Sequence, residues 1–343
     1  MPKPDSILAA RLTAQLLAGP PARDPVAVAE RVFAVQGQDP RGFRLAVRAR
    51  TSGLTAADVD RALTEDRSLV VTWVNRGTLH LVRSEDLPIL HAVTTPPLRT
   101  SSERRLAELG LPPDAAQRGV EVIERALAAE GPLAADELRE RLAKADVQSK
   151  GQALYHLLFK ATLDGLVVRG PIVRGKHAYV LIRDWLGPQE PPDRDAVLGE
   201  FARRYLAGHG PAHERDLARW ARIPLRDVRR GFEAIAKELD QLDDGLVDLK
   251  GRPRPAEPPA ARLLGAFEPC LLGWVSREPI YGDDRSFMTD PKLLDPFALV
   301  RGKAVAHWKL ADGEVELDAF RRLSREDREA LRKDAEDVKR FLG

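Results

Sequence analysis

An internal repeat in the middle of the chain restricts the possible fold more than any other feature of the sequence. In its first copy, a predicted helix at 120–129 leads to Gly131-Pro132, and two further helices follow, the last at 152–163. This last helix runs into Asp-Gly and an apolar β stretch at 164–168. The second copy repeats the order at 197–206, Gly210-Pro211, 225–239 and 244–249. A helix-turn-helix-helix-strand unit that occurs twice predicts tandem winged helices.

A looser third copy lies in the first hundred residues. Thr55 and Asp58 mark the start of a short helix that ends near residue 63, because a threonine N-cap and an acidic first turn favour a helix start. Residues 69–82 then change to a β pattern with a turn at 75–77, which predicts a hairpin. Since helices followed by a hairpin make up a winged helix, we predict three winged-helix units.

The C-terminal part of the chain has a different pattern. Proline- and glycine-rich breaks at 187–192 and 252–259 separate the repeat copy at 197–249 from its neighbours. Beyond the second break, strands are predicted at 263–267, 297–300 and 304–310. A last helix is predicted to begin at Ser324, with Asp327 as its capping partner. Its buried stripe is predicted to be Leu331, Ala335, Val338 and Leu342.

These patterns predict a mainly α (α+β) protein of several domains, since 343 residues are too many for one typical core. The three predicted winged-helix units cover 1–110, 111–187 and 193–251. A small β subdomain and the terminal helix are predicted to cover 260–343.

The composition fits a protein of the cytoplasm without a membrane span. No apolar run approaches the roughly 20 residues that a spanning helix needs, and the N-terminus has no apolar signal core. The lone cysteine, Cys270, rules out an intrachain disulfide and is interpreted as a small buried hydrophobe. A net charge of +2 neither requires nor excludes a nucleic-acid partner.

Several common enzyme motifs are missing from the sequence. It contains no Walker-type loop, no dinucleotide fingerprint and no Gly-x-Ser-x-Gly elbow. His209 and His213 have the spacing of a zinc helix, but Gly210-Pro211 interrupts the helix between them. We therefore expect neither a metal nor an organic cofactor.

Two glutamines stand out in a short connection between two predicted helices. Gln36 and Gln38 lie where one apolar helix pattern ends, and Asp39-Pro40 has the form of an N-cap with the first residue of the next helix. If the connection is extended, both amides point to the same side and could hold one small polar molecule such as water. The alternative is a pair of solvated loop side chains.

The motifs together resemble the AlkZ/YcaQ-type winged-helix DNA glycosylases of bacteria. The resemblance is carried by residues 35–41, 72–82, 210–217 and 263–273. It implies three winged helices with a small β region, and excision of N-alkylated purines, in some members with unhooking of interstrand crosslinks. It also implies that Gln36 and Gln38 are the catalytic Gln-x-Gln pair. Two departures are Gly37, where an aliphatic residue is usual, and residues 288–297, which replace a Gly-Asn-Gly-Ile-Phe segment.

An amide is too weak a base to deprotonate water, but it can hold water through hydrogen bonds. Alkylation at N3 or N7 makes the purine cationic and a good leaving group. Positioning can then contribute up to about 7–11 kcal/mol and a preorganised dipole about 3–4 kcal/mol. We therefore expect a monofunctional glycosylase that is selective for cationic lesions. Asp39 is the alternative catalytic residue, although its N-cap role is favoured.

The partner expected from this interpretation is double-stranded DNA with alkylated bases, bound by a monomer. Phosphate contacts are predicted for Arg41, Arg44 and Arg48, because arginines that bind phosphate position a duplex without reading its sequence. Arg76 and His80 border the hairpin turn and could reach DNA, or could equally be a turn arginine and a satisfied histidine.

Two other functions remain open at this point. Winged helices often belong to transcription regulators, so the chain could be a DNA-binding protein without enzymatic activity. It could also bind lesions and release no base.

Overall fold

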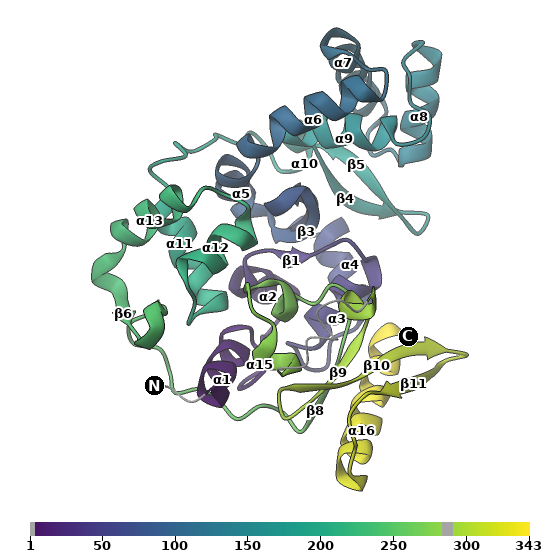
Figure 1. Cartoon of the computed structure of the whole chain (residues 1–343). Coiled ribbons are helices and arrows are strands. Elements are labelled where there is room, and N and C mark those ends of the chain that lie inside the picture. The colour runs from purple at the N-terminus through teal and green to yellow at the C-terminus, as the bar shows by residue number, and fades with distance from the viewer. Residues whose placement is uncertain (1–3, 283–290) are drawn as a thin grey trace. The chain divides into compact units, whose positions relative to one another are not determined.

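The computed structural model describes residues 4–282 and 291–343 (Figure 1). The chain divides into two compact units. The first unit contains Met1–Val59, Leu198–Trp220 and Pro224–Gly343, and the second contains Asp60–Val197 and Ala221–Ile223. The predicted segment 1–110 is thus divided between the units near residue 59. The bounds of the four predicted segments and the number of winged-helix units stay predictions.

The N-terminal helices of the first unit begin where the sequence supplies caps. They are α1 (Pro4–Ala14), α2 (Pro25–Val32) and α3 (Pro40–Arg48). Asp24 Oδ1 accepts the Ala27 N–H at 2.7 Å to cap α2, and a proline follows at the first helical position. α4 (Ala56–Thr64) follows, and Asp58 Oδ2 accepts the Thr55 N–H at 2.8 Å at its start.

The repeat copy at 197–249 lies almost entirely in the first unit and has the predicted order. It consists of α11 (Leu198–His209), α12 (Glu214–Ala221) and α13 (Leu225–Ala234), followed by the antiparallel pair β6 (Leu239–Gln241) and β7 (Val247–Leu249). α11 packs against α13 and against α2, with Phe33 edge-on to Phe201 at 5.3 Å between ring centroids.

An antiparallel sheet forms the C-terminal part of the first unit. Its strand order is β11-β10-β9-β8, from β8 (Ala261–Leu264), β9 (Phe297–Val300), β10 (Lys303–Ala311) and β11 (Glu314–Ala319). The short helices α14 (Pro269–Leu272) and α15 (Glu278–Tyr281) lie between β8 and β9 in the chain. Figure 1 shows β10 and β11 as a hairpin near α16.

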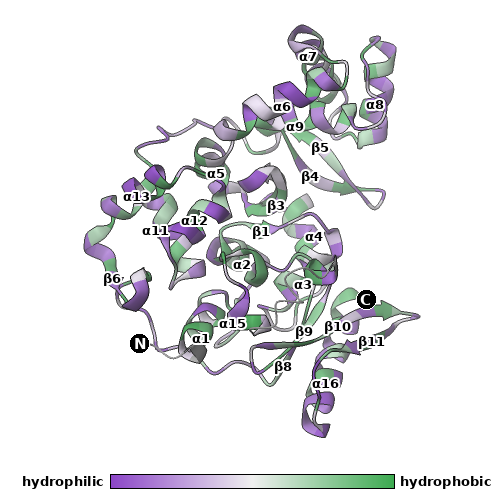
Figure 2. Ribbon diagram, viewed as in Figure 1, coloured by the Kyte–Doolittle hydropathy of each residue, from purple (hydrophilic) through white to green (hydrophobic). Residues whose placement is uncertain are grey.

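The terminal helix α16 (Arg325–Leu342) contacts β8 and begins at the predicted capping box. Ser324 Oγ accepts the Asp327 N–H at 3.0 Å, and Asp327 Oδ2 accepts the Ser324 N–H at 3.0 Å. Figure 2 shows hydrophilic and hydrophobic residues alternating along this helix. The predicted stripe is confirmed except at its end, where Phe341 is buried and Leu342 is only half-buried.

The second unit contains two β-hairpins and the helices that accompany them. Its strands β2 (Leu69–Val74), β3 (Thr78–Arg83), β4 (Val167–Val173) and β5 (Lys176–Leu181) form a sheet in the order β3-β2-β4-β5. Its helices are α5 (Leu87–Thr94), α6 (Pro96–Glu108), α7 (Pro113–Glu130), α8 (Ala135–Lys144), α9 (Ala153–Leu163) and α10 (Ile182–Trp185). The predicted hairpin at 69–82 is confirmed.

Trp73 lies in the core of the second unit. Its ring meets Tyr155 edge-on at 5.2 Å, and its Nε1 donates to the Tyr155 hydroxyl at 3.0 Å. Among the helices within 4–282 and 291–343, none combines the length and apolar composition that a membrane span requires.

Candidate functional site

The glutamine pair lies in a short connection between α2 and α3, as the sequence predicts. Gln36 ends the two-residue strand β1 (Val35–Gln36) and is buried, with 5% of its surface exposed. Gly37 is buried and Gln38 is exposed. A molecule arriving from solvent therefore reaches the amide of Gln38 first. The alternative of a pair of solvated loop side chains does not hold for Gln36, because Gln36 is enclosed.

Asp39 joins this connection to α3. Its Oδ1 accepts the Gly42 N–H at 2.6 Å, and its extended backbone is that of an N-cap residue. The capping role that the sequence favours is confirmed. One carboxylate oxygen is thereby engaged in holding the first turn of the helix that follows Gln38.

The body of α3 is fixed by close backbone packing and by buried charges. A Cβ atom on Gly42 would lie 2.5 Å from the carbonyl oxygen of Ala266, so only glycine fits there. Just beyond the helix, Arg50 Nη2 and Glu268 Oε1 are 2.5 Å apart, and both side chains are fully buried. Arg50 also donates to the carbonyl oxygens of Gln15 at 2.7 Å and Ala46 at 2.8 Å.

Arg48 lies inside this packing and is a correction to the predicted phosphate contacts. Only 1% of its side chain is exposed, and it forms ion pairs with Asp334 at 2.7 Å and with Asp337 at 2.8 Å. Its charge is satisfied by α16, so it is not available to DNA. Arg41 is exposed and Arg44 is half-buried, with Arg44 Nη1 donating to the Pro40 carbonyl at 2.7 Å. These two remain candidates for phosphate contacts.

The hairpin turn of the second unit gives a second correction. His80 is 1% exposed, and its Nδ1 lies 2.9 Å from the Thr78 carbonyl oxygen. Burial, together with the nearby charge of Arg76, lowers the pKa of His80 to about 3. A neutral, enclosed imidazole is not a phosphate contact, so the satisfied-histidine alternative is correct. Arg76 is half-buried at the turn, with a φ of +57°, and remains a candidate.

Asn75, at the same turn, is a residue that the sequence analysis missed. It is fully buried, and neither its Oδ1 nor its Nδ2 has a hydrogen-bond partner within residues 4–282 and 291–343. Buried amides are nearly always hydrogen-bonded, so Asn75 is a candidate for contact with a water molecule or a ligand. Its burial depends on tertiary packing, and no local pattern in the sequence signals it.

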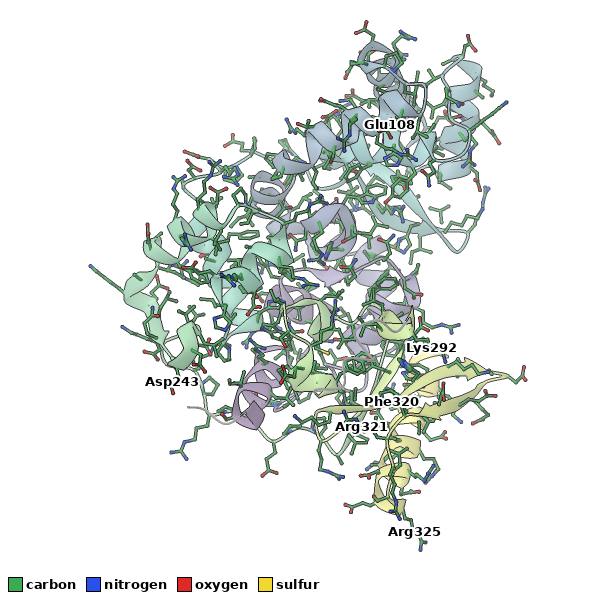
Figure 3. The ribbon with its side chains drawn as sticks, viewed as in Figure 1. Glu108, Asp243, Lys292, Phe320, Arg321 and Arg325 are labelled. Carbon is green, nitrogen blue, oxygen red and sulfur yellow. The ribbon has the colours of Figure 1, made fainter. Side chains whose placement is uncertain are left out.

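A hollow of about 820 Å³ begins at Asp39 in the first unit. It extends from the first turn of α3 to β10 and β11. Lys292, labelled in Figure 3, pairs with Asp318 at 3.0 Å, and Lys309 pairs with Glu316 at 2.8 Å. Of the divergent segment 288–297, residues 288–290 lie outside the described residues.

His209 and Cys270, the residues considered for metal binding and thiol chemistry, are both buried in the core. His209 is fully buried, its ring stacks on Tyr205 at 4.6 Å, and its Nδ1 lies 3.1 Å from the Tyr205 carbonyl oxygen. Within 4–282 and 291–343, no group of three or more His, Cys, Asp or Glu side chains is placed to hold a metal ion. Cys270 is buried, and this burial, together with Glu268, raises the pKa of its thiol well above the usual value.

Comparisons with known proteins cover almost the whole chain. The family described as DNA glycosylase AlkZ-like matches residues 29–341. An interstrand DNA cross-link repair glycosylase of Streptomyces sahachiroi is 28% identical over 349 residues, covering 92% of this chain and 90% of that protein. The solved structure of Streptomyces sahachiroi DNA glycosylase AlkZ matches with a TM-score of 0.80 at 23% identity, covering 98% of this chain and 96% of that one. The family match includes the Gln36–Asp39 connection.

Proposed function

We propose, since the chain belongs to the AlkZ-like DNA glycosylase family, that this enzyme is a monofunctional glycosylase for purines alkylated at N3 or N7. DNA glycosylases cleave the N-glycosyl bond between base and sugar. The proposal rests mainly on the exposed amide of Gln38. Gln38 lies directly before Asp39, the N-cap of α3, and two residues after the buried Gln36.

The reaction suits a pair of neutral side chains. Alkylation leaves the purine positively charged, so the electron pair of the N-glycosyl bond can depart with the base while the sugar becomes cationic. Gln38 would exchange hydrogen bonds with a water molecule that then adds to the sugar C1′ and gives up its extra proton to solvent. Gln36, being enclosed, would fix the strand from which Gln38 projects. An undamaged base leaves too slowly for such mild assistance, so selectivity arises from the leaving group.

The packing of α3 supports a role for Gln38 in positioning water, because it restrains the chain directly after Gln38. The Asp39 cap, the Gly42 contact with Ala266 and the buried Arg50–Glu268 pair all restrain the helix that begins directly after the glutamines. A restrained helix start holds the connection before it in one geometry, which positional catalysis requires. Asp39 remains the alternative catalytic residue, because it is half-buried next to Gln38.

Crosslinked DNA is a further proposed substrate. The Streptomyces sahachiroi relative is named an interstrand DNA cross-link repair glycosylase, and it aligns with most of this chain. A crosslink through N7 of guanine carries the same positive charge as a simple alkyl lesion. We propose that the same glutamines release such a base and so unhook the crosslink.

An excision assay tests the proposed function. A duplex with one N7-methylguanine, a duplex with an N3-alkyladenine and an undamaged duplex are incubated with the enzyme, and abasic sites are then cleaved with alkali. Cleavage at both lesions and none in the undamaged duplex is the expected result. Tight binding to alkylated duplexes without base release would instead favour a protein that binds lesions and releases no base. The departures from the family pattern at Gly37 and at 288–297 are the reason to consider that alternative.

A further inference from the structure

Phe267 has an unusual backbone conformation and lines the hollow that begins at Asp39. Its φ is +56°, and its N–H donates to the Leu294 carbonyl oxygen at 2.9 Å. A bulky side chain rarely adopts the left-handed region, and such strain persists where the surrounding structure fixes it, often at binding sites. Phe267 is only half-buried, so the strained backbone is not explained by placing the ring in a core.

The walls of the hollow are largely apolar. Leu45, Trp308, Leu310 and Leu317 line it together with Phe267. Trp308 Nε1 donates to the Leu264 carbonyl oxygen at 2.8 Å, so the indole presents no unsatisfied N–H. Leu317 leaves 37% of its surface exposed, which is unusual for a large apolar side chain. A volume of about 820 Å³ lies within the range of roughly 300–1,000 Å³ that is typical of small-molecule sites.

The charges around the hollow do not suit a phosphate group. Its acidic residues, Asp39, Asp295, Glu316 and Asp318, outnumber its basic residues, Arg41, Lys292 and Lys309, by four to three. Both lysines are paired with acidic partners across the rim. An apolar cavity with a slight acidic excess favours an apolar or aromatic group that is attached to a cation.

We infer that this hollow binds the substituent of an alkylated base, with an aromatic substituent stacked on Phe267. The inference rests on the proposed function and names the lesions that it would favour. Asp39 in the wall follows Gln38 directly in the chain, so the cavity opens one residue from the amide that would hold the attacking water. The inference places the N7 substituent of the departing base in this cavity. The site therefore selects for bulky, aromatic-bearing lesions over simple methyl lesions.

The test compares two lesions that differ in the substituent alone. One duplex carries N7-methylguanine and the other N7-benzylguanine. Phe267→Ala removes the stacking face, and Leu317→Trp fills the cavity from β11. Leu242→Trp is the matched control, because Leu242 is 39% exposed in the same unit and lies outside this cavity. Single-turnover excision rates and duplex affinity by fluorescence anisotropy are measured for each protein.

Loss of one stacking contact should lower binding and excision of the benzyl lesion about tenfold, with the methyl lesion changed less than twofold. Leu317→Trp should do the same, and Leu242→Trp should alter neither lesion. Equal losses for both lesions, or no loss for either, would overturn the inference. If the wild type releases neither base, the proposed glycosylase function fails. The anisotropy data then still decide whether Phe267 favours the benzyl duplex.

Discussion

The two ends of α3 use arginine in opposite ways. At the N-terminal end, Arg41 and Arg44 follow the glutamine connection and remain accessible. At the C-terminal end, Arg48 and Arg50 are buried against carboxylates of α16 and of the segment before α14. One end of the helix can therefore face a ligand because the other is held firmly in the protein. The four arginines look equivalent in the sequence and differ only in their distant partners.

The largest expected effect comes from the buried pair at the C-terminal end. Glu268→Ala leaves the Arg50 guanidinium buried without its counter-charge, which typically costs about 3–5 kcal/mol of unfolding free energy. Denaturant unfolding followed by circular dichroism measures this loss. The control Arg41→Ala should stay within about 0.5 kcal/mol of wild type, as surface changes usually do. Similar losses for both variants would remove the contrast between the ends.

His80 differs from both pairs of arginines, because burial keeps its side chain neutral and it needs no counter-charge. Its folded pKa of about 3 lies below its unfolded value, so the unfolded chain binds more protons between the two values. The stability associated with a neutral His80 is full above about pH 6.5 and is lost as the pH falls toward 3. His80→Gln should therefore lose less stability than wild type between pH 7 and pH 4 in thermal unfolding. Parallel losses would show that His80 is accessible to protons in the folded state.

The cap at the N-terminal end should have a smaller effect on stability. Asp39→Ala removes the acceptor of the Gly42 N–H and should cost about 1 kcal/mol, while Asp39→Asn keeps an acceptor there and should cost much less. Urea unfolding of the two variants measures the difference. If both variants lose the same stability, the charge of Asp39 matters more than its capping bond.

The accessible arginines should affect DNA binding with almost no effect on stability. Removing Arg41 and Arg44 together should reduce the slope of log affinity against log salt by about 2, because each phosphate contact contributes about 0.9. Anisotropy titrations from low to moderate salt give this slope. Lys333→Ala on α16 is a control for loss of an exposed positive charge away from the N-terminal end of α3. An unchanged slope for the double variant would exclude α3 from the DNA interface.

Local patterns predicted the elements well, because caps and turns are encoded nearby. The capping residues Asp39 and Ser324 and the hairpin turn at 75–77 all lie where the sequence places them. The burial and pairing of individual side chains depend on distant partners, so they could not be predicted from the sequence. Arg48 meets Asp334 across 286 residues of chain, so no window around α3 predicts its burial. The left-handed backbone of Phe267 likewise depends on a hydrogen bond to Leu294.

In the proposed mechanism, Gln38 positions water beside a base that damage has already made ready to leave, and Gln36 fixes the strand that carries Gln38. Single-turnover excision of N7-methylguanine by Gln38→Ala and Asp39→Asn tests it most directly, with Gln117→Ala as an exposed-glutamine control in α7. Gln38→Ala should lose roughly 10²–10³-fold in the excision rate, as when one positioned dipole is removed, while Asp39→Asn and Gln117→Ala should stay close to wild type. Full excision by Gln38→Ala together with lost excision by Asp39→Asn would contradict this mechanism.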